Sequence, residues 1–297
     1  MIPERPLGAT GESLSIIGIG GWDVAAASSE GESIAIMHEA IDAGINLFDN
    51  CWEYHEGYAE EVMGRALKGG RRGKVFLMTK GCGRTYEDAR RHLEDSLRRL
   101  GTDWIDLWQF HAVKRDSDPE LILDLESGAM RAALEAREAG KIRYIGFTGH
   151  ASPRFHLAML EHDVVWDAVQ MPTNVLDPHY DSFEHNVLPV LNRRDIGVLG
   201  MKSLASQEGR IVRDTGISAS LARRYALSLP ITSLVCGIQT RDELRHDIAL
   251  ADDFVPLTAK EREEVLAIAE PFARDGHIED YKVGDWGCNF HAERAAG

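Results

Sequence analysis

The segment VFLMTKGCGRTYEDARRHLEDSLRRLGTDWIDLWQFH, residues 75–111, begins and ends with a short apolar run and has a helical pattern between the two runs. Short apolar runs of this kind are typical of buried strands. The middle part, residues 86–101, places Leu93, Leu97 and Leu100 on one helical face and ends in glycine, which commonly terminates helices. The segment therefore predicts a strand, a helix and a second strand that lies parallel to the first.

The same unit recurs along the whole chain. Apolar runs lie at residues 15–21, 46–49, 75–80, 105–111, 143–149, 167–171, 197–202 and 233–238. Segments with helical periodicity follow them at residues 33–44, 59–69, 86–101, 128–141, 153–161, 183–195, 218–229 and 241–251. Pro189 lies inside the sixth of these segments, so we expect that helix to start late or to kink.

Eight such units in series fit either a doubly wound sheet or a closed barrel. No linker or low-complexity tract divides the chain, and 297 residues suit one large barrel. The sequence GIGG at 18–21 does not match the G-x-G-x-x-G pattern of dinucleotide-binding sheets. The sequence therefore predicts an α/β protein, a single (β/α)8 TIM barrel domain over residues 1–297.

The composition makes several classes of partner unfavourable. The formal net charge of -15 does not suit binding to nucleic acid, which needs a basic face. No apolar run approaches the roughly 18 residues that cross a membrane, and the N-terminus lacks the pattern of a secretory signal. The four cysteines form no C-x-x-C pair, so no metal is expected. We expect a cytoplasmic protein with a small-molecule partner, and its oligomeric state is open.

Polar residues follow the predicted strands at the end where barrel enzymes place their active sites. Asp49 ends the second strand and Tyr54 follows it, Lys80 ends the third strand, and His111 ends the fourth. Each residue alone has an ordinary interpretation, such as a helix cap for Asp49 or a solvated ammonium for Lys80. Their convergence on one mouth of a barrel indicates a site.

The chemistry of this set fits carbonyl reduction. A phenol has an unperturbed pKa near 10, and a neighbouring ammonium lowers it, so Lys80, held by Asp49, is expected to tune Tyr54 as a general acid. Neutral His111 is expected to hydrogen-bond a substrate carbonyl oxygen and orient it toward Tyr54. Protein side chains supply no hydride, so a nicotinamide cofactor is implied.

The motifs LFDNCWEY, VFLMTK and RLGTDWIDLWQFH resemble those of the aldo-keto reductase superfamily, and the resemblance covers nearly the whole chain. It implies a (β/α)8 barrel that binds NADP(H) or NAD(H) in an extended form. It also implies reduction of an aldehyde or ketone to an alcohol, or the reverse reaction. The implied catalytic tetrad consists of Asp49, Tyr54, Lys80 and His111.

The resemblance also implies a set of binding residues. For the substrate these are Trp22, Tyr54, His55 and His111. For the cofactor they are Gly21, Trp22, Asp49, Thr148, Gly149, Gln170, Met201, Lys202, Ser203, Gly237, Ile238, Gln239, Thr240, Arg241, Glu243 and Asp247. Several positions depart from the family pattern, three of them near the nicotinamide and the substrate. Gly149 replaces a common Asn, Met201 replaces an aromatic residue that stacks on nicotinamide, and His55 replaces a common Gly.

Several alternatives stay open. Glu243 stands where many members have an Arg for the 2′-phosphate of NADP, which suits NAD(H), whereas Arg241 and the wider use of NADP(H) in the family favour NADP(H). A cofactor-binding regulatory protein with little turnover is possible on the same barrel. A metal-dependent isomerase or hydrolase is a third class, although the histidines show no H-E-x-x-H spacing. Residues 272–297, with Trp286, Phe290 and His291, form a tail that either covers the substrate mouth or docks loosely.

Overall fold

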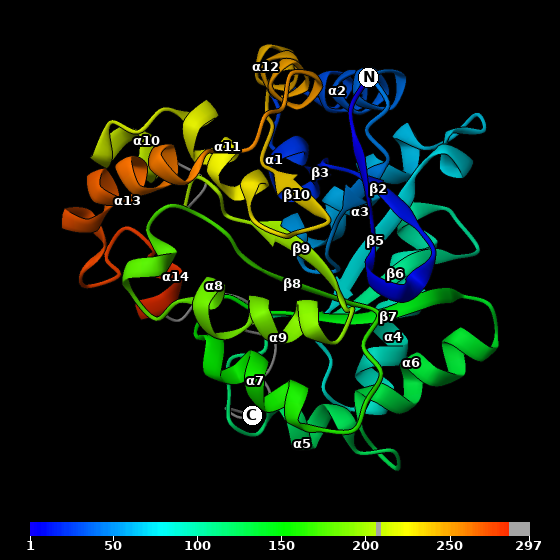
Figure 1. The fold of residues 1–297 in the computed structure, drawn as a ribbon. Helices are drawn as coiled ribbons and strands as arrows, with labels where there is room; N and C mark the ends of the chain where they lie inside the picture. The colour runs from blue at the N-terminus through cyan, green and yellow to red at the C-terminus, as the bar shows by residue number, and fades with distance from the viewer. Residues whose placement is uncertain (206–208, 285–297) are drawn as a thin grey trace.

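A computed structural model describes residues 1–205 and 209–284. Within these residues, eight parallel strands close into a barrel at the centre of the molecule, and helices surround it (Figure 1). In barrel order the strands are β3 (Ile17–Gly20), β4 (Leu47–Asp49), β5 (Phe76–Gly81), β6 (Ile105–Phe110), β7 (Ile142–Thr148), β8 (Ala168–Pro172), β9 (Gly197–Met201) and β10 (Ser233–Cys236). The predicted (β/α)8 barrel is confirmed.

The helices that follow the strands match the predicted segments. They are α2 (Glu30–Asp42), α3 (Tyr58–Ala66), α4 (Tyr86–Leu100), α6 (Ala129–Glu138), α7 (Pro153–Glu161), α8 (Phe183–Asn186), α9 (Leu188–Arg193), α11 (Ala219–Ser228) and α12 (Arg241–Asp252). Thr85 caps the N-terminus of α4, and Gly101 ends it in the left-handed conformation. The break expected at Pro189 is confirmed, because α8 and α9 are separate helices and Pro189 lies in the first turn of α9.

Some elements were not predicted. An antiparallel hairpin, β1 (Glu4–Pro6) and β2 (Ser13–Ser15), precedes the barrel. Additional helices lie in loops or beyond β10, namely the short helices α1 (Gly21–Ala25), α5 (Asp118–Leu123), α10 (Arg210–Thr215) and α14 (Asp280–Val283) and the longer helix α13 (Ala259–Ala273). The start of α13 carries a detectable signal, since Thr258 and Glu261 form a capping box.

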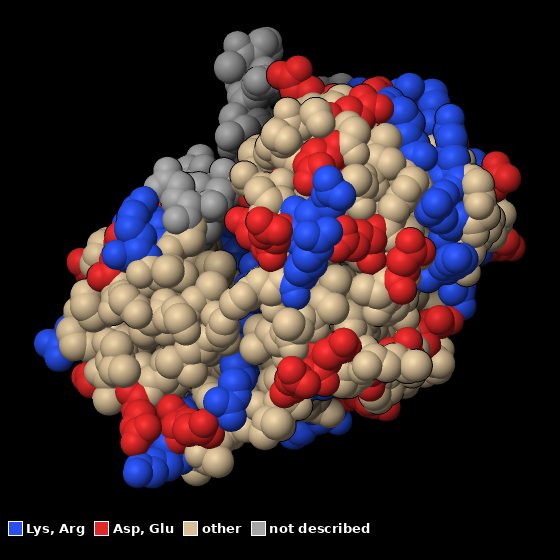
Figure 2. Space-filling view, turned by 90° about the horizontal axis from the view of Figure 1, so that it is seen from above, with Lys and Arg blue, Asp and Glu red and all other residues tan. Residues whose placement is uncertain are grey.

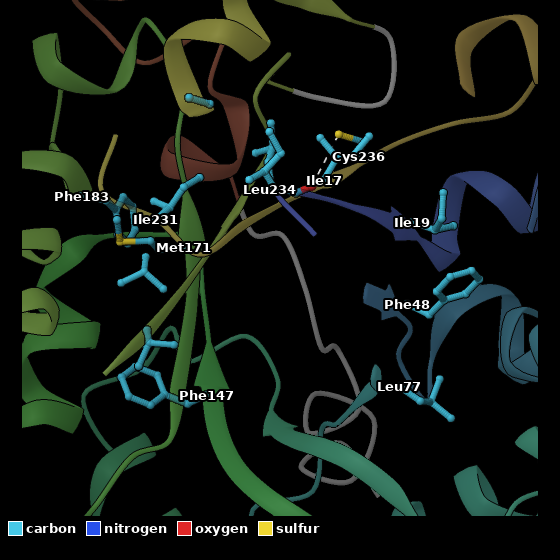
Figure 3. Packing of buried hydrophobic residues seen from close by; sticks show 14 of the residues in the cluster. Ile17, Ile19, Phe48, Leu77, Phe147, Met171, Phe183, Ile231, Leu234 and Cys236 are labelled. Carbon is cyan, nitrogen blue, oxygen red and sulfur yellow. Dashed lines mark hydrogen bonds between the residues drawn. The ribbon is translucent and has the colours of Figure 1, made fainter. Parts of the chain in front are cut away.

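Two apolar layers hold the barrel. Side chains that point into it form a cluster that includes Leu47, Met78 and Leu107, and a much larger cluster lies between strands and helices. Figure 3 shows the outer layer, in which Phe48 and Leu77 on neighbouring strands point to the same side. Successive residues of a strand point to opposite faces, so the inner and outer residues alternate.

The N-terminal hairpin closes one end of the barrel. Leu7 and Leu14 are fully buried and belong to the inner apolar cluster. They precede β3, so they lie at the end where the strands begin. The opposite end, where the strands finish, carries the polar residues described below.

The visible surface carries charged side chains of both signs. Figure 2 shows acidic and basic side chains in small alternating groups on the face that it presents. Among the described residues, no helix has both the length and the apolar character needed to cross a membrane.

Candidate active site

A polar layer lies directly above the inner apolar layer. Residues two apart on a strand point to the same face. The inward Leu47, Met78, Leu107 and Ala168 are therefore followed by inward-pointing Asp49, Lys80, Gln109 and Gln170. All four polar side chains are buried. The strand pattern thus explains why they meet inside the barrel.

Asp49 and Lys80 form a buried ion pair at the centre of this layer. Lys80 Nζ donates to Asp49 Oδ1 at 2.5 Å and to the carbonyl oxygen of Asn50 at 2.8 Å. Gln170 Nε2 donates to the other carboxylate oxygen of Asp49 at 3.2 Å. Each charge is therefore satisfied by a partner, as burial requires.

Tyr54 lies above this pair, at the start of a 3-10 turn (Tyr54–Gly57) after β4. Lys80 Nζ lies 3.4 Å from its hydroxyl oxygen. Burial first, and then neighbouring acidic groups, raise the pKa of Tyr54 well above its ordinary value. The net shift of this pKa is opposite to the lowering expected from Lys80, because burial and the neighbouring acidic groups raise it. The phenol is consequently protonated at neutral pH, the state that a proton donor needs.

His111 directly follows β6, and its ring meets the Tyr54 ring edge-on with centroids 5.9 Å apart. Its Nδ1 lies 3.0 Å from Glu53 Oε1 and 3.3 Å from the sulfur of Cys51. Burial lowers the pKa of His111, although the Glu53 carboxylate acts in the opposite direction. All four predicted tetrad residues therefore meet at one mouth of the barrel.

An aromatic pair flanks the tetrad. The His55 ring stacks on Trp22 with centroids 4.4 Å apart, and its Nε2 donates to the Trp22 carbonyl oxygen at 2.8 Å. His55 has φ +48°, a left-handed conformation that favours glycine. This conformation explains why glycine is common at the position. The stacking and the hydrogen bond offset a backbone cost of about 1–2 kcal/mol.

A cavity of about 1250 Å³ opens above the polar layer. The predicted residues that line it are Gly21, Trp22, Asp49, Tyr54, His111, Gln170, Met201, Lys202, Ser203, Gly237, Gln239, Glu243 and Asp247. Other predicted residues lie outside its lining, namely His55, Lys80, Thr148, Gly149, Ile238, Thr240 and Arg241. The volume exceeds the roughly 300–1,000 Å³ of typical small-ligand pockets.

Gly149 is required by close packing. A Cβ at this position would lie 2.6 Å from the carbonyl oxygen of Val113 and 3.0 Å from the His156 ring. An asparagine therefore cannot occupy the position without a backbone shift. Thr148 is buried beside Gln170, its register partner on β8.

Glu243 and Arg241, which were predicted to bind the cofactor, contact other parts of the protein. Glu243 accepts from the backbone amides of Gln239 and Thr240 at 2.8 and 3.1 Å, and so forms the capping box of α12. Arg241 pairs with Glu32 on α2 at 3.1 Å. Both side chains therefore have a structural role. The sequence alone could not distinguish this role from cofactor binding.

Several cavity residues were missed from the sequence. Those with charged or ionisable side chains include Asp23, Glu53, His150, Arg213 and Arg223. His150 follows β7 and is buried, and its Nε2 has no hydrogen-bond partner among the described residues. The position of His150 at the end of a predicted strand could have indicated that it lies at the barrel mouth. Arg223 lies within a helix, and no sequence pattern indicated that it lines the cavity.

The cavity has features that fit an anionic dinucleotide. Arg223 is buried and pairs with Asp247, and its Nε has no partner among the described residues. Lys202 follows β9 and supplies a second cation to the lining. Gly21 lets the chain pass close to Asn50, because a Cβ there would lie 2.7 Å from that side chain. Buried cations beside close-packed glycine backbone are suited to phosphate groups.

One cluster combines possible metal donors. The donor atoms of Cys51, Glu53, Cys82 and His111 lie within 4.8 Å of one another. Such sets bind metal ions in some proteins. Here the Glu53–His111 contact has the length of a hydrogen bond. We expect these side chains to contact one another without a metal ion, and dialysis against a chelator tests this expectation.

The described part of the predicted tail packs beside the cavity. Tyr281 in α14 is buried and meets the His150 ring edge-on, with centroids 5.7 Å apart. Lys282 is fully buried and binds Asp177 at 2.8 Å and Glu279 at 3.0 Å. Trp286, Phe290 and His291 lie outside the described residues.

The family model for the aldo/keto reductase family matches residues 16–215. The chain belongs to the aldo/keto reductase family. Aldo-keto reductase YhdN of Bacillus subtilis (strain 168) is 32% identical over 214 residues, which are 66% of this chain and 60% of that relative. The chain thus matches less than two thirds of this relative's length. The L-galactose dehydrogenase of Arabidopsis thaliana is 26% identical over 317 aligned residues, 91% of this chain and 95% of that protein.

Solved aldo-keto reductase structures share the fold. Aldo-keto reductase AKR11C1 from Bacillus halodurans, in its holo form, has a TM-score of 0.73 and 23% identity, covering 93% of this chain and 100% of that chain. The match to the family model confirms the family resemblance drawn from the sequence motifs.

Proposed function

We propose that the chain is an NAD(P)H-dependent oxidoreductase that interconverts an aldehyde or ketone and its alcohol. The observation that carries this proposal is the contact chain from Asp49 through Lys80 to Tyr54, with Lys80 Nζ 2.5 Å from the carboxylate and 3.4 Å from the phenol oxygen. This chain lies at the cavity of about 1250 Å³. In the proposed reaction Tyr54 donates the proton to the carbonyl oxygen, and His111 orients that oxygen.

The cofactor supplies the hydride when bound. Gln170 is proposed to hold its carboxamide end, and Lys202 and Arg223 its phosphates. The preference for NADP(H) over NAD(H) stays a prediction. Since Arg241 pairs with Glu32 and Glu243 caps α12, the cations proposed to decide it are Arg223 and Arg213, which line the cavity.

The substrate is proposed to carry hydroxyl groups. His150 Nε2 is buried without a partner among the described residues, and Glu53 presents a partly exposed carboxylate to the same cavity. A purely apolar substrate would leave the buried His150 Nε2 unpaired, at a cost of about 1–3 kcal/mol. The relative named L-galactose dehydrogenase makes polyhydroxylated compounds the first substrates to test.

The test joins binding with turnover. Fluorescence titration with NADPH and NADH is expected to show binding of at least one cofactor, and a panel of carbonyl compounds and alcohols is expected to show turnover. Tyr54→Phe is expected to abolish turnover and keep cofactor binding. Tyr86→Phe is the matched control, because that hydroxyl bonds Glu135 on the exterior of the barrel. Near wild-type turnover by Tyr54→Phe would refute the assignment, and binding without turnover by the wild type would favour a regulatory protein.

A further inference from the structure

We propose that Arg99, which lies on the outer helix α4 and outside the cavity lining, is a positioning residue that holds the turn carrying Tyr54 in its reactive place. The inference rests on the proposed function, because it concerns the proton donor of that reaction. It gives a side chain on the far side of the barrel wall a measurable effect on turnover.

The turn after β4 has an unfavourable backbone conformation. His55, Glu56 and Gly57 have φ of +48°, +57° and +94°, which makes three left-handed residues in succession. This conformation is unfavourable for His55 and Glu56, because each Cβ lies too close to the following carbonyl oxygen. Strained backbone of this kind persists only where the surrounding structure fixes it. Tyr54 directly precedes these residues, so the contacts that fix the turn also fix the phenol.

Arg99 contacts the chain on both sides of Tyr54. Its Nη1 donates to the carbonyl oxygen of Trp52 at 2.8 Å, two residues before the phenol. Its guanidinium also lies against Gly57, three residues after the phenol, where an added Cβ would overlap it. A guanidinium is planar and holds its donors in a rigid arrangement. One rigid group therefore fixes both ends of the turn.

The Trp52 peptide connects Arg99 to the strand that carries Lys80. Its N–H donates to the Lys80 carbonyl oxygen at 2.9 Å, and its own carbonyl oxygen accepts from Arg99. The peptide thus lies between Arg99 and the backbone of the residue whose Nζ is 3.4 Å from the Tyr54 hydroxyl oxygen. Arg99 consequently holds Tyr54 in place relative to Lys80.

Glu60 on α3 holds Arg99 in turn. Its carboxylate accepts from Arg99 Nη1 at 3.3 Å and from the hydroxyl of Thr79 at 2.7 Å. Thr79 directly precedes Lys80 on β5, so this second route ends at the same strand as the first. The side chains of Glu60 and Arg99 are 0% and 14% exposed, which limits the freedom of the guanidinium to move.

The same pair also stabilises the fold, so the test must separate stability from positioning. Arg99→Met leaves the Glu60 carboxylate buried without its cation, which is strongly destabilising. Glu60→Gln combined with Arg99→Met removes this unpaired charge, but the hydrogen bond to Trp52 stays missing. The double variant is therefore expected to unfold at a urea concentration closer to that of the wild type than Arg99→Met does.

Turnover is measured at a temperature at which circular dichroism shows every variant to be folded. Both Arg99→Met and the double variant are expected to lower kcat about 10- to 100-fold, since a misplacement of about 1 Å can cost about 100-fold. The KM for the carbonyl compound and the Kd for the cofactor are expected to stay within about twofold, because Arg99 lies outside the cavity lining. A kcat that recovers together with stability in the double variant would overturn the inference.

Two further variants of α4 sharpen the comparison. Arg99→Lys is expected to keep a larger share of kcat than Arg99→Met, because an ammonium still donates to Trp52 but has no planar group to lie against Gly57. A kcat in Arg99→Lys as low as in Arg99→Met would contradict the role of the hydrogen bond. Arg90→Met is the matched control with unchanged kcat, since Arg90 is 57% exposed and pairs with Glu87 on the same helix.

The position of the turn can also be measured without turnover. The Trp22 and His111 rings lie 5.3 and 5.9 Å from the Tyr54 ring, so their ring currents shift its signals in carbon-13 NMR of tyrosine-labelled protein. Tyr54→Phe assigns these signals. They are expected to move in the double variant and to stay in place in Arg90→Met, and unmoved signals in the double variant would overturn the inference. If the wild type turns over no carbonyl, the proposed function fails, while the NMR signals still decide whether Arg99 fixes the turn.

Discussion

Replacing Lys80 by methionine would leave the Asp49 carboxylate buried without its main partner. The side chains of Lys80 and Asp49 are 1% and 5% exposed, so water cannot take the place of the ammonium. Breaking a buried pair by removing one partner costs about 3–5 kcal/mol. We expect Lys80→Met to lower the free energy of unfolding by this amount, and we expect Asp49→Asn to cost a similar amount because it leaves the buried Lys80 ammonium without its carboxylate partner.

The double variant gives the sharper result. With both charges removed, the penalty for an unpaired carboxylate disappears, so Asp49→Asn combined with Lys80→Met is expected to be more stable than the sum of the single changes predicts. Interaction energies for neighbouring residues run from about 0.5 to 3 kcal/mol, and we expect a value in the upper half of this range.

Urea unfolding followed by circular dichroism measures all three variants. Lys68→Met is the control, because Lys68 is exposed and its loss should stay within about 0.5 kcal/mol. Additive effects of the two single changes would refute the reasoning, since they would mean that the pair contributes no coupling. All site variants are expected to lose turnover, so activity does not enter this measurement.

Three further outcomes are expected. His150→Leu should raise KM for hydroxylated substrates about 5- to 150-fold, from the loss of a hydrogen bond worth about 1–3 kcal/mol; a KM equal to wild type would remove His150 from substrate binding. Burial lowers the pKa of His156 to about 4, so between about pH 6.5 and pH 4 the unfolded state binds a proton that the folded state does not. The free energy of unfolding should therefore fall by up to about 3 kcal/mol as the pH drops through this range. His156→Phe should flatten this pH dependence in unfolding curves, and an unchanged pH dependence would contradict the assignment. Dialysis against a chelator should leave turnover unchanged; a loss that added zinc restores would show that the cluster around Cys51 holds a metal.

The sequence was informative wherever a strand carried its own signal. Their positions at the ends of predicted strands placed Asp49 and Lys80 at the mouth of the barrel, and Pro189 located the break between α8 and α9. These features depend on residues near each other in the chain, which is why local patterns predict them.

Contacts between distant segments could not be predicted in the same way. Arg223 and Asp247 come from different helices and meet at the cavity, and neither has a pattern that points to the other. Glu53 lies in a loop, where only the folded barrel brings it to His111. The predicted direction of the Tyr54 pKa shift was wrong for a related reason. That direction depends on how deeply the phenol is buried, which the sequence does not give.

The apolar side chains inside the barrel also restrict the access of water to the buried ion pair. Leu7, Leu14 and the inward residues of the strands lie beneath the Lys80–Asp49 pair and separate it from solvent at the closed end. Isotope exchange at this buried ammonium therefore proceeds from the open mouth. A molecule bound in the mouth would block that exchange. The time for which Lys80 retains deuterium would therefore report the lifetime of the bound state.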